Sequence, residues 1–468
     1  MTRDEESRPV PAMAGLTLGA SLAGLTVAGI AGRILTLEEF ALLAACLAVA
    51  GTIAALVAGG GLVAPLLRVL HPPFAAAAGW RGISGFARAL LVLVLGLGAG
   101  LALAFGPGAG LFGQLSPANE LDGAAPTAGG LVALMAFAAA LAGTFAALGR
   151  RGLETAFAPG HAFGGPIATL LTLALLLSVM WGGGPLDLMV VLGLVLFGHA
   201  LAAALAAVLL SGEIGRQAAR EDDAHGPRAE GLIHLALAIA ASILASAEIW
   251  ILLARGDLVA LAQFAAALAL VAAILAPLAA AHAAIGPFLG ALHAYGEHAS
   301  LERLARAVTT VAAIPTLLLV IVALVWPSEL LSLVFGPRFA PAAPALRALL
   351  PGAALAALAG PGLAIIAETG HTRIALVIAV LGGLVTAGFG LALVGPFGLA
   401  GLAAATSVGL ALASLLANAH LSARQDLIPA AYRRPEMVLA SLVAFVEEVG
   451  RLFPARRGED AAQSYYQG

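Results

Sequence analysis

The stretch GLIHLALAIAASILASAEIWILLARGDLVALAQFAA, residues 231–266, decides the class of fold. Its first part, 231–253, is an apolar run about as long as the roughly 20 helical residues that cross a membrane. A four-residue turn follows, and a second apolar run begins at 258. We therefore expect two membrane-spanning helices joined by a short turn. Glu248 lies within the first of them, and we take it to be the only carboxylate of the chain inside an apolar span.

The composition extends this expectation to the whole chain. Of its 468 residues, 61% are hydrophobic and only 10% are charged, which is far outside the range of soluble domains. The apolar runs show no strand-like alternation, so we expect helices that satisfy their own backbone. The single cysteine, Cys46, excludes a disulfide framework. The charged start of the chain leads into a run of full spanning length, which we expect to be a retained first helix.

The pattern predicts an all-α polytopic membrane protein with twelve transmembrane helices. The basic residues, all arginine, support this count: with the N-terminus inside, nineteen fall on inner segments and four on outer ones. Such a bias predicts that both termini are cytoplasmic. The predicted spans are 12–32, 41–63, 86–106, 128–148, 162–181, 187–210, 231–253, 258–281, 306–326, 344–366, 374–394 and 398–419.

The charged linker 211–230 divides the spans into two sets of six. The residues that lead into the second helix are similar to those that lead into the eighth, which indicates a weak repeat. We therefore expect an N-terminal six-helix lobe, 1–220, a C-terminal six-helix lobe, 221–423, and a cavity between them. The tail 424–468 contains an amphipathic run, which we expect to lie on the inner leaflet or to dock a partner protein.

Several stretches resemble the polysaccharide-exporter flippases of the multidrug/oligosaccharidyl-lipid/polysaccharide (MOP) superfamily, the group that contains the O-antigen flippases. They are GRILTLEEFALLAACLAVAGTIAALVAGGGLVAPLLR (32–68), AEIWILLARGDLVALAQFAAALALVAAILAPLAA (247–280), FLGALHAYGEHASLERLARAVTT (288–310), LVFGPRFAPAAPALRALLPGAALAALAGPGLAIIAETGHTR (333–373) and VGPFGLAGLAAATSVG (394–409). Their order and spacing carry the resemblance, which covers both halves. It implies a bundle of two six-helix lobes, as in MATE and other MOP transporters, whose central cavity opens to one side at a time.

The resemblance also implies a function. The expected protein is a flippase of the inner (plasma) membrane that moves a polyprenyl-pyrophosphate-linked oligosaccharide outward by alternating access, for synthesis of lipopolysaccharide O-antigen or another exported polysaccharide. A glycan polymerase and other polysaccharide assembly proteins would be its partners. The alternatives are a drug/cation antiporter of the same fold, a membrane-embedded glycan polymerase or ligase, and a non-transporting scaffold. An acid in the first helix is common in such antiporters, and 12–32 has none. A lipid II flippase is a further alternative, against which the resemblance counts because that branch usually carries fourteen spans and more basic helices.

Glu248 is the first candidate site residue. An ionisable group at membrane depth is costly and usually faces protein or water. It is either a proton- or cation-responsive group in the cavity or a shallow acid that pairs with Arg255, seven residues further on. His234 shares a face with Glu248 and would extend a polar stripe toward the cavity. Gln263, in the next helix, is a further polar candidate, although a packed, hydrogen-bonded role is the more common one.

Arginines supply the remaining candidates. On the inner side Arg68, followed by further arginines, could form a basic entrance that binds pyrophosphate, or could simply anchor the topology. On the outer side Arg33, Arg255, Arg338 and Arg347 run against the charge bias, so a cationic lining or gate at the outer mouth is one interpretation. Thr36 and Glu39 form a capping box that predicts the start of the second helix.

No sequence pattern predicts a catalytic or metal-binding site. His282, His293, Glu297 and His298 cluster in sequence, but glycines and prolines between them argue against a metal site. No nucleotide-binding loop or nucleophile motif is present. We therefore expect no cofactor, no metal, no catalytic residue and no nucleic-acid partner. We also expect that the protein is not an enzyme.

Overall fold

The computed structural model describes residues 9–58, 164–184, most of 186–201, parts of 237–246, nearly all of 247–432, and three positions after that. Among these residues all regular structure is helical. The helices are α1 (Pro9–Ile34), α2 (Leu37–Ala58), α7 (Gly164–Trp181), α10 (Ala247–Arg255), α11 (Leu258–Ile274), α12 (Ala276–Ala294), α13 (His298–Val325), α14 (Pro327–Phe335), the 3₁₀ helix η3 (Pro337–Ala342), α15 (Ala343–Ala359), α16 (Gly362–Glu368) and α17 (Thr372–Gln425). Two predicted spans, 86–106 and 128–148, lie outside the described residues. The same is true of Arg68, His199, His234 and nearly all of the tail.

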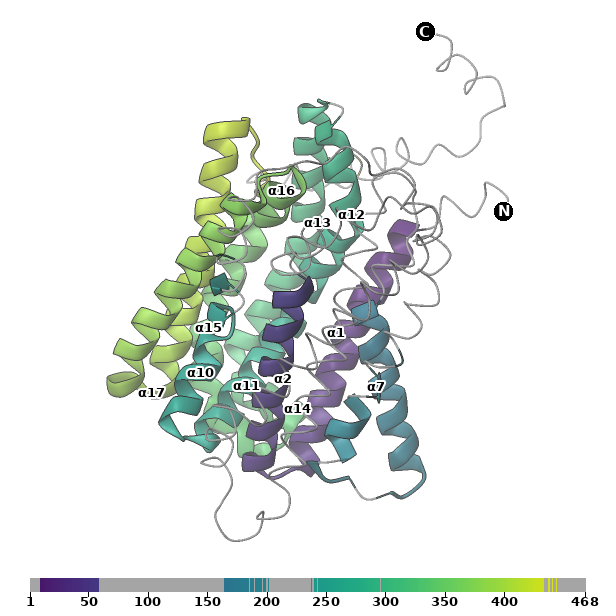
Figure 1. Ribbon diagram of the computed structural model, residues 1–468, viewed down its shortest axis with the longest axis vertical. Helices are drawn as coiled ribbons and strands as arrows, with labels where there is room; N and C mark the ends of the chain where they lie inside the picture. Colours follow the sequence, from purple (N-terminus) through teal and green to yellow (C-terminus); the bar gives the residue numbers. More distant parts are fainter. Residues whose placement is uncertain are drawn as a thin grey trace, which may run out of the picture.

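The long helices lie side by side along the long axis of the molecule (Figure 1). We call the end at which α1 begins the inner end, because the arginine bias predicts that it faces the cytoplasm, and the opposite end the outer end. The start of α13 and the end of α17 lie at the inner end, whereas α14 lies at the outer end (Figure 1). Among the described residues, four helices are long and apolar enough to cross a membrane, or five if the bent pair α11–α12 counts as one span.

The 54 residues of α17 form two antiparallel segments. Gly398 has φ 57° and ψ −141°, which is not a helical conformation, and the chain reverses direction there. Glycine adopts such a conformation more readily than any other residue. The two segments then pack so closely that a Cβ on Gly382 would lie 2.9 Å from the carbonyl oxygen of Gly409. This reversal matches the gap expected between the predicted spans 374–394 and 398–419. Small residues allow such close packing of helices in membranes.

Three predicted continuous spans are broken. The span 231–253 is wrong as one helix, because a turn at 245–246 separates earlier helical residues from α10. The span 258–281 bends by 50° at Leu275, since the ring of Pro277 cannot fit a straight helix. The span 344–366 ends at Ala359, because Gly360 has φ 78° and Pro361 follows it.

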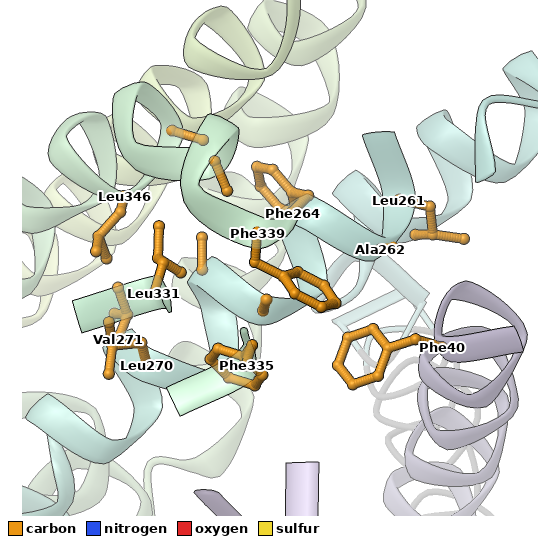
Figure 2. Packing of buried hydrophobic residues seen from close by; sticks show 14 of the residues in the cluster. Phe40, Leu261, Ala262, Phe264, Leu270, Val271, Leu331, Phe335, Phe339 and Leu346 are labelled. Carbon is orange, nitrogen blue, oxygen red and sulfur yellow. The ribbon is translucent and has the colours of Figure 1, made fainter. Parts of the chain in front are cut away.

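The main apolar core joins helices from the two halves of the chain. One cluster buries four phenylalanines: Phe40 of α2, Phe264 of α11, Phe335 at the end of α14 and Phe339 of η3 (Figure 2). Helix α2 packs against α11, and α1 packs against α11, α12 and α14. The expected division into lobes 1–220 and 221–423 stays a prediction, because 59–163 and 202–236 lie outside the described residues.

Candidate functional site

A cavity of about 320 Å³ lies between helices of the two halves. From the first half, α1, α2, α7 and the segment 188–201 line it; from the second half, Ala265 and Ala269 of α11 do so. Its lining is mostly apolar, with Thr169 and Thr172 of α7 as the polar exceptions. The hydroxyl of Thr172 donates to the carbonyl of Ala168 at 2.8 Å, so the helix itself satisfies it. Such an interior can hold an apolar group without a desolvation penalty.

An aromatic cluster closes the contact between the halves at the outer end. The ring of Phe40, which also lines the cavity, lies 5.2 Å from the ring of Phe339 and 6.1 Å from that of Phe335, both in edge-on geometry. Phe335 and Phe339 are fully buried (Figure 2). Edge-on aromatic pairs stabilise a contact beyond the area that they bury. The cluster therefore separates the cavity from the outer end.

Two arginines fasten the same contact. Arg33 of α1 donates from Nε to the carbonyl of Val334 at 3.1 Å and from Nη2 to the carbonyl of Leu333. In the opposite direction Arg338 donates from Nη2 to the carbonyls of Gly32 and Leu35. These carbonyls lie at the C-terminal ends of α14 and α1, where they lack partners within the helix and carry partial negative charge. We call these four bonds the arginine clasp.

Glycines let the two halves approach here. A Cβ on Gly32 would lie 2.9 Å from Cδ1 of Phe335, and one on Gly29 would lie 3.1 Å from Cγ1 of Val334. The backbone of α1 therefore rests directly on the end of α14. A larger side chain at Gly32 would push the helices apart.

The structure places Glu248 inside the protein. It is buried, with 7% of its surface exposed, in the first turn of α10, which packs on α17, α11 and α2. In the turn before α10 the carbonyl of Ile243 accepts from the N–H of Ser246 at 3.3 Å, and the indole Nε1 of Trp250 also donates to it at 3.1 Å. Negative charge is favourable in the first turn of a helix, where backbone N–H groups are free.

The other predicted site residues lie apart from Glu248 or are outside the described residues. Arg255 is exposed, and no ion pair joins it to Glu248 in the part of the chain that the structure describes. Gln263 is half-buried on α11, between the buried Ala262 and Phe264, and is not among the described residues that line the cavity. Arg33 is in the clasp, at the outer mouth. No position can be given for Arg68 or His234.

Sequence reasoning missed a pocket of about 1100 Å³ at the inner end. It brings His293 and His298 together with His371 and His420, which the sequence analysis did not single out. All four lie at the predicted inner side, His293 and His298 in the connection between the spans 258–281 and 306–326 and the other two beside span ends, and that shared side was the available signal. The glycines and prolines between His282 and His293 do not interrupt the helix, since α12 continues to Ala294.

Comparisons with solved structures identify the fold. A crystal structure of MATE in complex with MaD5 superimposes with a TM-score of 0.58 at 17% identity, over 90% of this chain and 96% of that one. An outward-facing MATE family multidrug resistance transporter of the MOP superfamily gives 0.54 at 16%, over 90% and 97%. The inward closed lipid II flippase MurJ gives 0.56 at 12%, over 96% and 94%. No family model and no curated protein matches the sequence.

Proposed function

We propose that this protein is an alternating-access transporter that flips a polyprenyl-pyrophosphate-linked oligosaccharide from the inner to the outer leaflet. The observation that carries the proposal is the closed contact at the outer end, made by α1 and α2 on one side and by α14 and η3 on the other. Its aromatic cluster and its clasp join segments some 300 residues apart in the chain. A transporter that opens to one side at a time needs such a separable closure between its halves.

The fold supports the transport part of the proposal. The solved structures that it resembles are of MATE transporters and of a lipid II flippase, and both kinds belong to proteins that move a substrate across a membrane. The two halves of the chain would then be the two lobes that move against each other. On this proposal the protein transports its substrate and does not change it chemically, and it works in the inner membrane with both termini in the cytoplasm.

The lining of the cavity argues against a cationic drug as the substrate. The first helix has no acidic residue, and the lining among described residues is apolar with two threonines. A cation in such a cavity would have no partner for its charge, and burial of an unpaired charge is costly. The diphosphate of the substrate would be bound by arginines, for which Arg68 is the first candidate. Enzymes of polysaccharide assembly would be its partners.

A disulfide across the outer contact tests the closure and the function together. In a Cys46→Ala background, the pair Gly29→Cys and Val334→Cys would place two thiols within reach of each other, since a Cβ at 29 lies 3.1 Å from a γ-carbon of Val334. Oxidation should stop the flipping of a fluorescent polyprenyl-diphosphate oligosaccharide in proteoliposomes, and reduction should restore it.

The matched control is a disulfide that does not cross the halves. The pair Gly362→Cys and Ala417→Cys joins α16 to α17, where the two β-carbons would lie 3.0 Å apart. This pair should leave flipping unchanged when oxidised. If the protein moves cationic dyes against a proton gradient and leaves lipid-linked glycans in place, the antiporter alternative is correct and the flippase proposal is wrong.

A further inference from the structure

Among the described residues, the pocket of about 1100 Å³ at the inner end is lined only by the second half of the chain. We call it the inner histidine pocket. Helix α12 contributes its last turn, α13 its first turns, and α17 both its beginning and its end. Its lining residues are His293, His298, Ala299, Glu302, His371, Ile374, His420, Arg424, Gln425 and Asp426. Neither the outer closure nor the cavity between the halves involves any of these residues.

The histidines form two neighbouring pairs in this pocket. The rings of His293 and His298 lie 5.5 Å apart, and those of His371 and His420 lie 6.4 Å apart. The amide Nε2 of Gln425 lies 3.4 Å from Nδ1 of His371, within hydrogen-bond distance. Nδ1 of His293 is buried without a hydrogen-bond partner in the described structure. The pocket therefore has spare imidazole hydrogen-bonding capacity.

Two long helices also begin at this pocket without a side-chain cap. The N-cap of α13 is Glu297 and that of α17 is His371, and neither side chain accepts a hydrogen bond from its helix. His298 and Ala299, in the first turn of α13, line the pocket. The free N–H groups and the dipole at a helix N-terminus attract anions, phosphates above all. Two such ends meet here beside the guanidinium of Arg424.

The carboxylates in the pocket do not cancel its positive charge once the histidines are protonated. Glu302 forms an ion pair with Arg306 at 3.2 Å, so its charge is largely neutralised. Asp426, at the end of α17, offsets Arg424. Glu297, Arg303 and Arg373 are exposed nearby but are not among the lining residues. The net charge of the lining thus depends on how many of the four imidazoles carry a second proton.

We propose that the inner histidine pocket binds a phosphate-type anion, held by the imidazoles, Arg424 and the N-termini of α13 and α17, and that binding takes up protons. Burial, and then the neighbouring rings of His298 and His371, lower the pKa of His293 in the empty pocket. A bound anion reverses this effect by stabilising the imidazolium. Binding is therefore tight at low pH and weakens as the pH rises through the pKa values of the liganded histidines.

A metal ion fits the same residues less well. No group of three or more His, Cys, Asp or Glu side chains within the described ranges could hold a metal ion. Zinc sites need ligands at about 2.0–2.2 Å from one centre. The rings here lie in two pairs, 5.5 Å and 6.4 Å between centroids, around an open pocket that leaves room for a larger anion.

The test is calorimetric titration of the full-length protein in detergent with inorganic pyrophosphate. We expect binding at pH 6, a loss of roughly tenfold in affinity per pH unit for each proton taken up, and net proton uptake when buffers of different ionisation enthalpy are compared. His371→Gln and Arg424→Gln, both at exposed positions, should each weaken binding at pH 6 by about tenfold or more.

Arg373→Gln is the matched control, because Arg373 is exposed at the same end of α17 as His371 and does not line the pocket. It should bind pyrophosphate like the unmodified protein. The proposal is overturned if pyrophosphate does not bind, if its affinity is independent of pH, or if Arg373→Gln weakens it as much as Arg424→Gln does. Binding of Zn²⁺ without binding of pyrophosphate would assign the histidines to a metal instead. Unfolding midpoints check that each variant is folded.

A second arm separates the two sources of such an anion. In nanodiscs of phosphatidylcholine the affinity for pyrophosphate should match that in detergent. If the natural occupant is a lipid headgroup, phosphatidylglycerol in the disc will compete with pyrophosphate, and Arg424→Gln will weaken that competition. If it is a free phosphate compound, both kinds of nanodisc will give the same affinity. This binding site is independent of flipping, so failure of one proposal leaves the other standing.

Discussion

Arg33 and Arg338 form reciprocal caps: Arg33 caps the C-terminal end of α14, and Arg338 caps the C-terminal end of α1. Arg33 stands at the end of α1 and donates to carbonyls at the end of α14, whereas Arg338 follows α14 and donates to carbonyls at the end of α1. All four bonds cross from one half of the chain to the other. A charged donor on an unpaired helix carbonyl satisfies a group that otherwise needs water. The outer closure therefore consists of two reciprocal arginine contacts around the aromatic cluster.

Removal of the clasp should favour opening at the outer end. Arg338→Gln loses its two bonds to α1, which we expect to cost the closed state about 1–3 kcal/mol, the usual range for hydrogen bonds to a charged group. Arg33 is exposed, so Arg33→Gln should cost less. The spread of distances between spin labels on α1 and η3 should shift to larger values. Arg255→Gln, an exposed arginine after α10, is the control and should leave the distances unchanged.

The aromatic cluster should contribute more to stability than the arginine clasp does. Phe40→Ala removes a ring that is 96% buried and leaves a hole between Phe335 and Phe339, so we expect a loss of about 3–5 kcal/mol in the free energy of unfolding. Leu47, on the same helix but 42% exposed, gives the control Leu47→Ala, with a loss well below that of Phe40→Ala. Denaturant or thermal unfolding in detergent measures both. Equal losses would mean that the cluster is not a packed centre.

The capping box at α2 is a sequence prediction that the structure confirms. The backbone N–H of Thr36 donates to Oε2 of Glu39 at 2.8 Å, and the N–H of Glu39 donates to the hydroxyl of Thr36 at 3.2 Å. Thr36→Ala should therefore cost about 1 kcal/mol of stability. Glu38→Ala removes an acid of the same turn that takes no part in the box and should cost less. Unfolding of the two variants under one condition compares them directly.

The lowered pKa of His293 predicts how stability depends on pH. Its pKa in the folded protein is below that in the unfolded chain, so below the unfolded value the unfolded chain binds more protons. Stability is then greatest above that value and falls as the pH falls through the lower, folded one. His293→Gln should reduce this loss between pH 7 and pH 5. If the variant loses as much stability on acidification as the unmodified protein, other groups cause the loss.

Local signals in the sequence predicted the helices well because each depends on a short window. Thr36 and Glu39 fixed the start of α2, and Asp257 caps α11 through its carboxylate and the N–H of Ala260 at 2.9 Å. The break at 245–246 had no such signal, since LASAE (244–248) contains neither proline nor glycine. There the cause is tertiary: a Cβ on Gly383 of α17 would lie 2.5 Å from Cβ of Leu244.

The candidate sites were harder to predict for a similar reason. Charge bias singled out Arg33 and Arg338 as exceptions, but their partners are backbone carbonyls some 300 residues away, which no sequence pattern marks. His371 and His420 meet only because α17 folds back on itself at Gly398 and returns its end to the level of its beginning. Sequence periodicity predicts that a helix ends at the inner side, but it does not predict which other helix ends lie beside it.

Glu248 provides the decisive test of coupling. It is buried in the first turn of α10, and no ion pair joins it to the exposed Arg255 within the described residues. If it responds to protons, Glu248→Gln, which keeps shape and hydrogen bonds but cannot titrate, should remove the dependence of flipping on the pH gradient. The protein should still insert and fold, because a buried neutral amide costs less than a buried charge.

The measurement is the rate of flipping in proteoliposomes with and without an imposed pH gradient, for the unmodified protein, Glu248→Gln and Arg255→Gln. A coupling role predicts that only Glu248→Gln gives equal rates under the two conditions. A role for Glu248 as the partner of Arg255 predicts instead that both variants lose a little stability and stay coupled. Normal pH-dependent flipping by Glu248→Gln would therefore assign the carboxylate to the structure of α10, where free N–H groups of the first turn stabilise it.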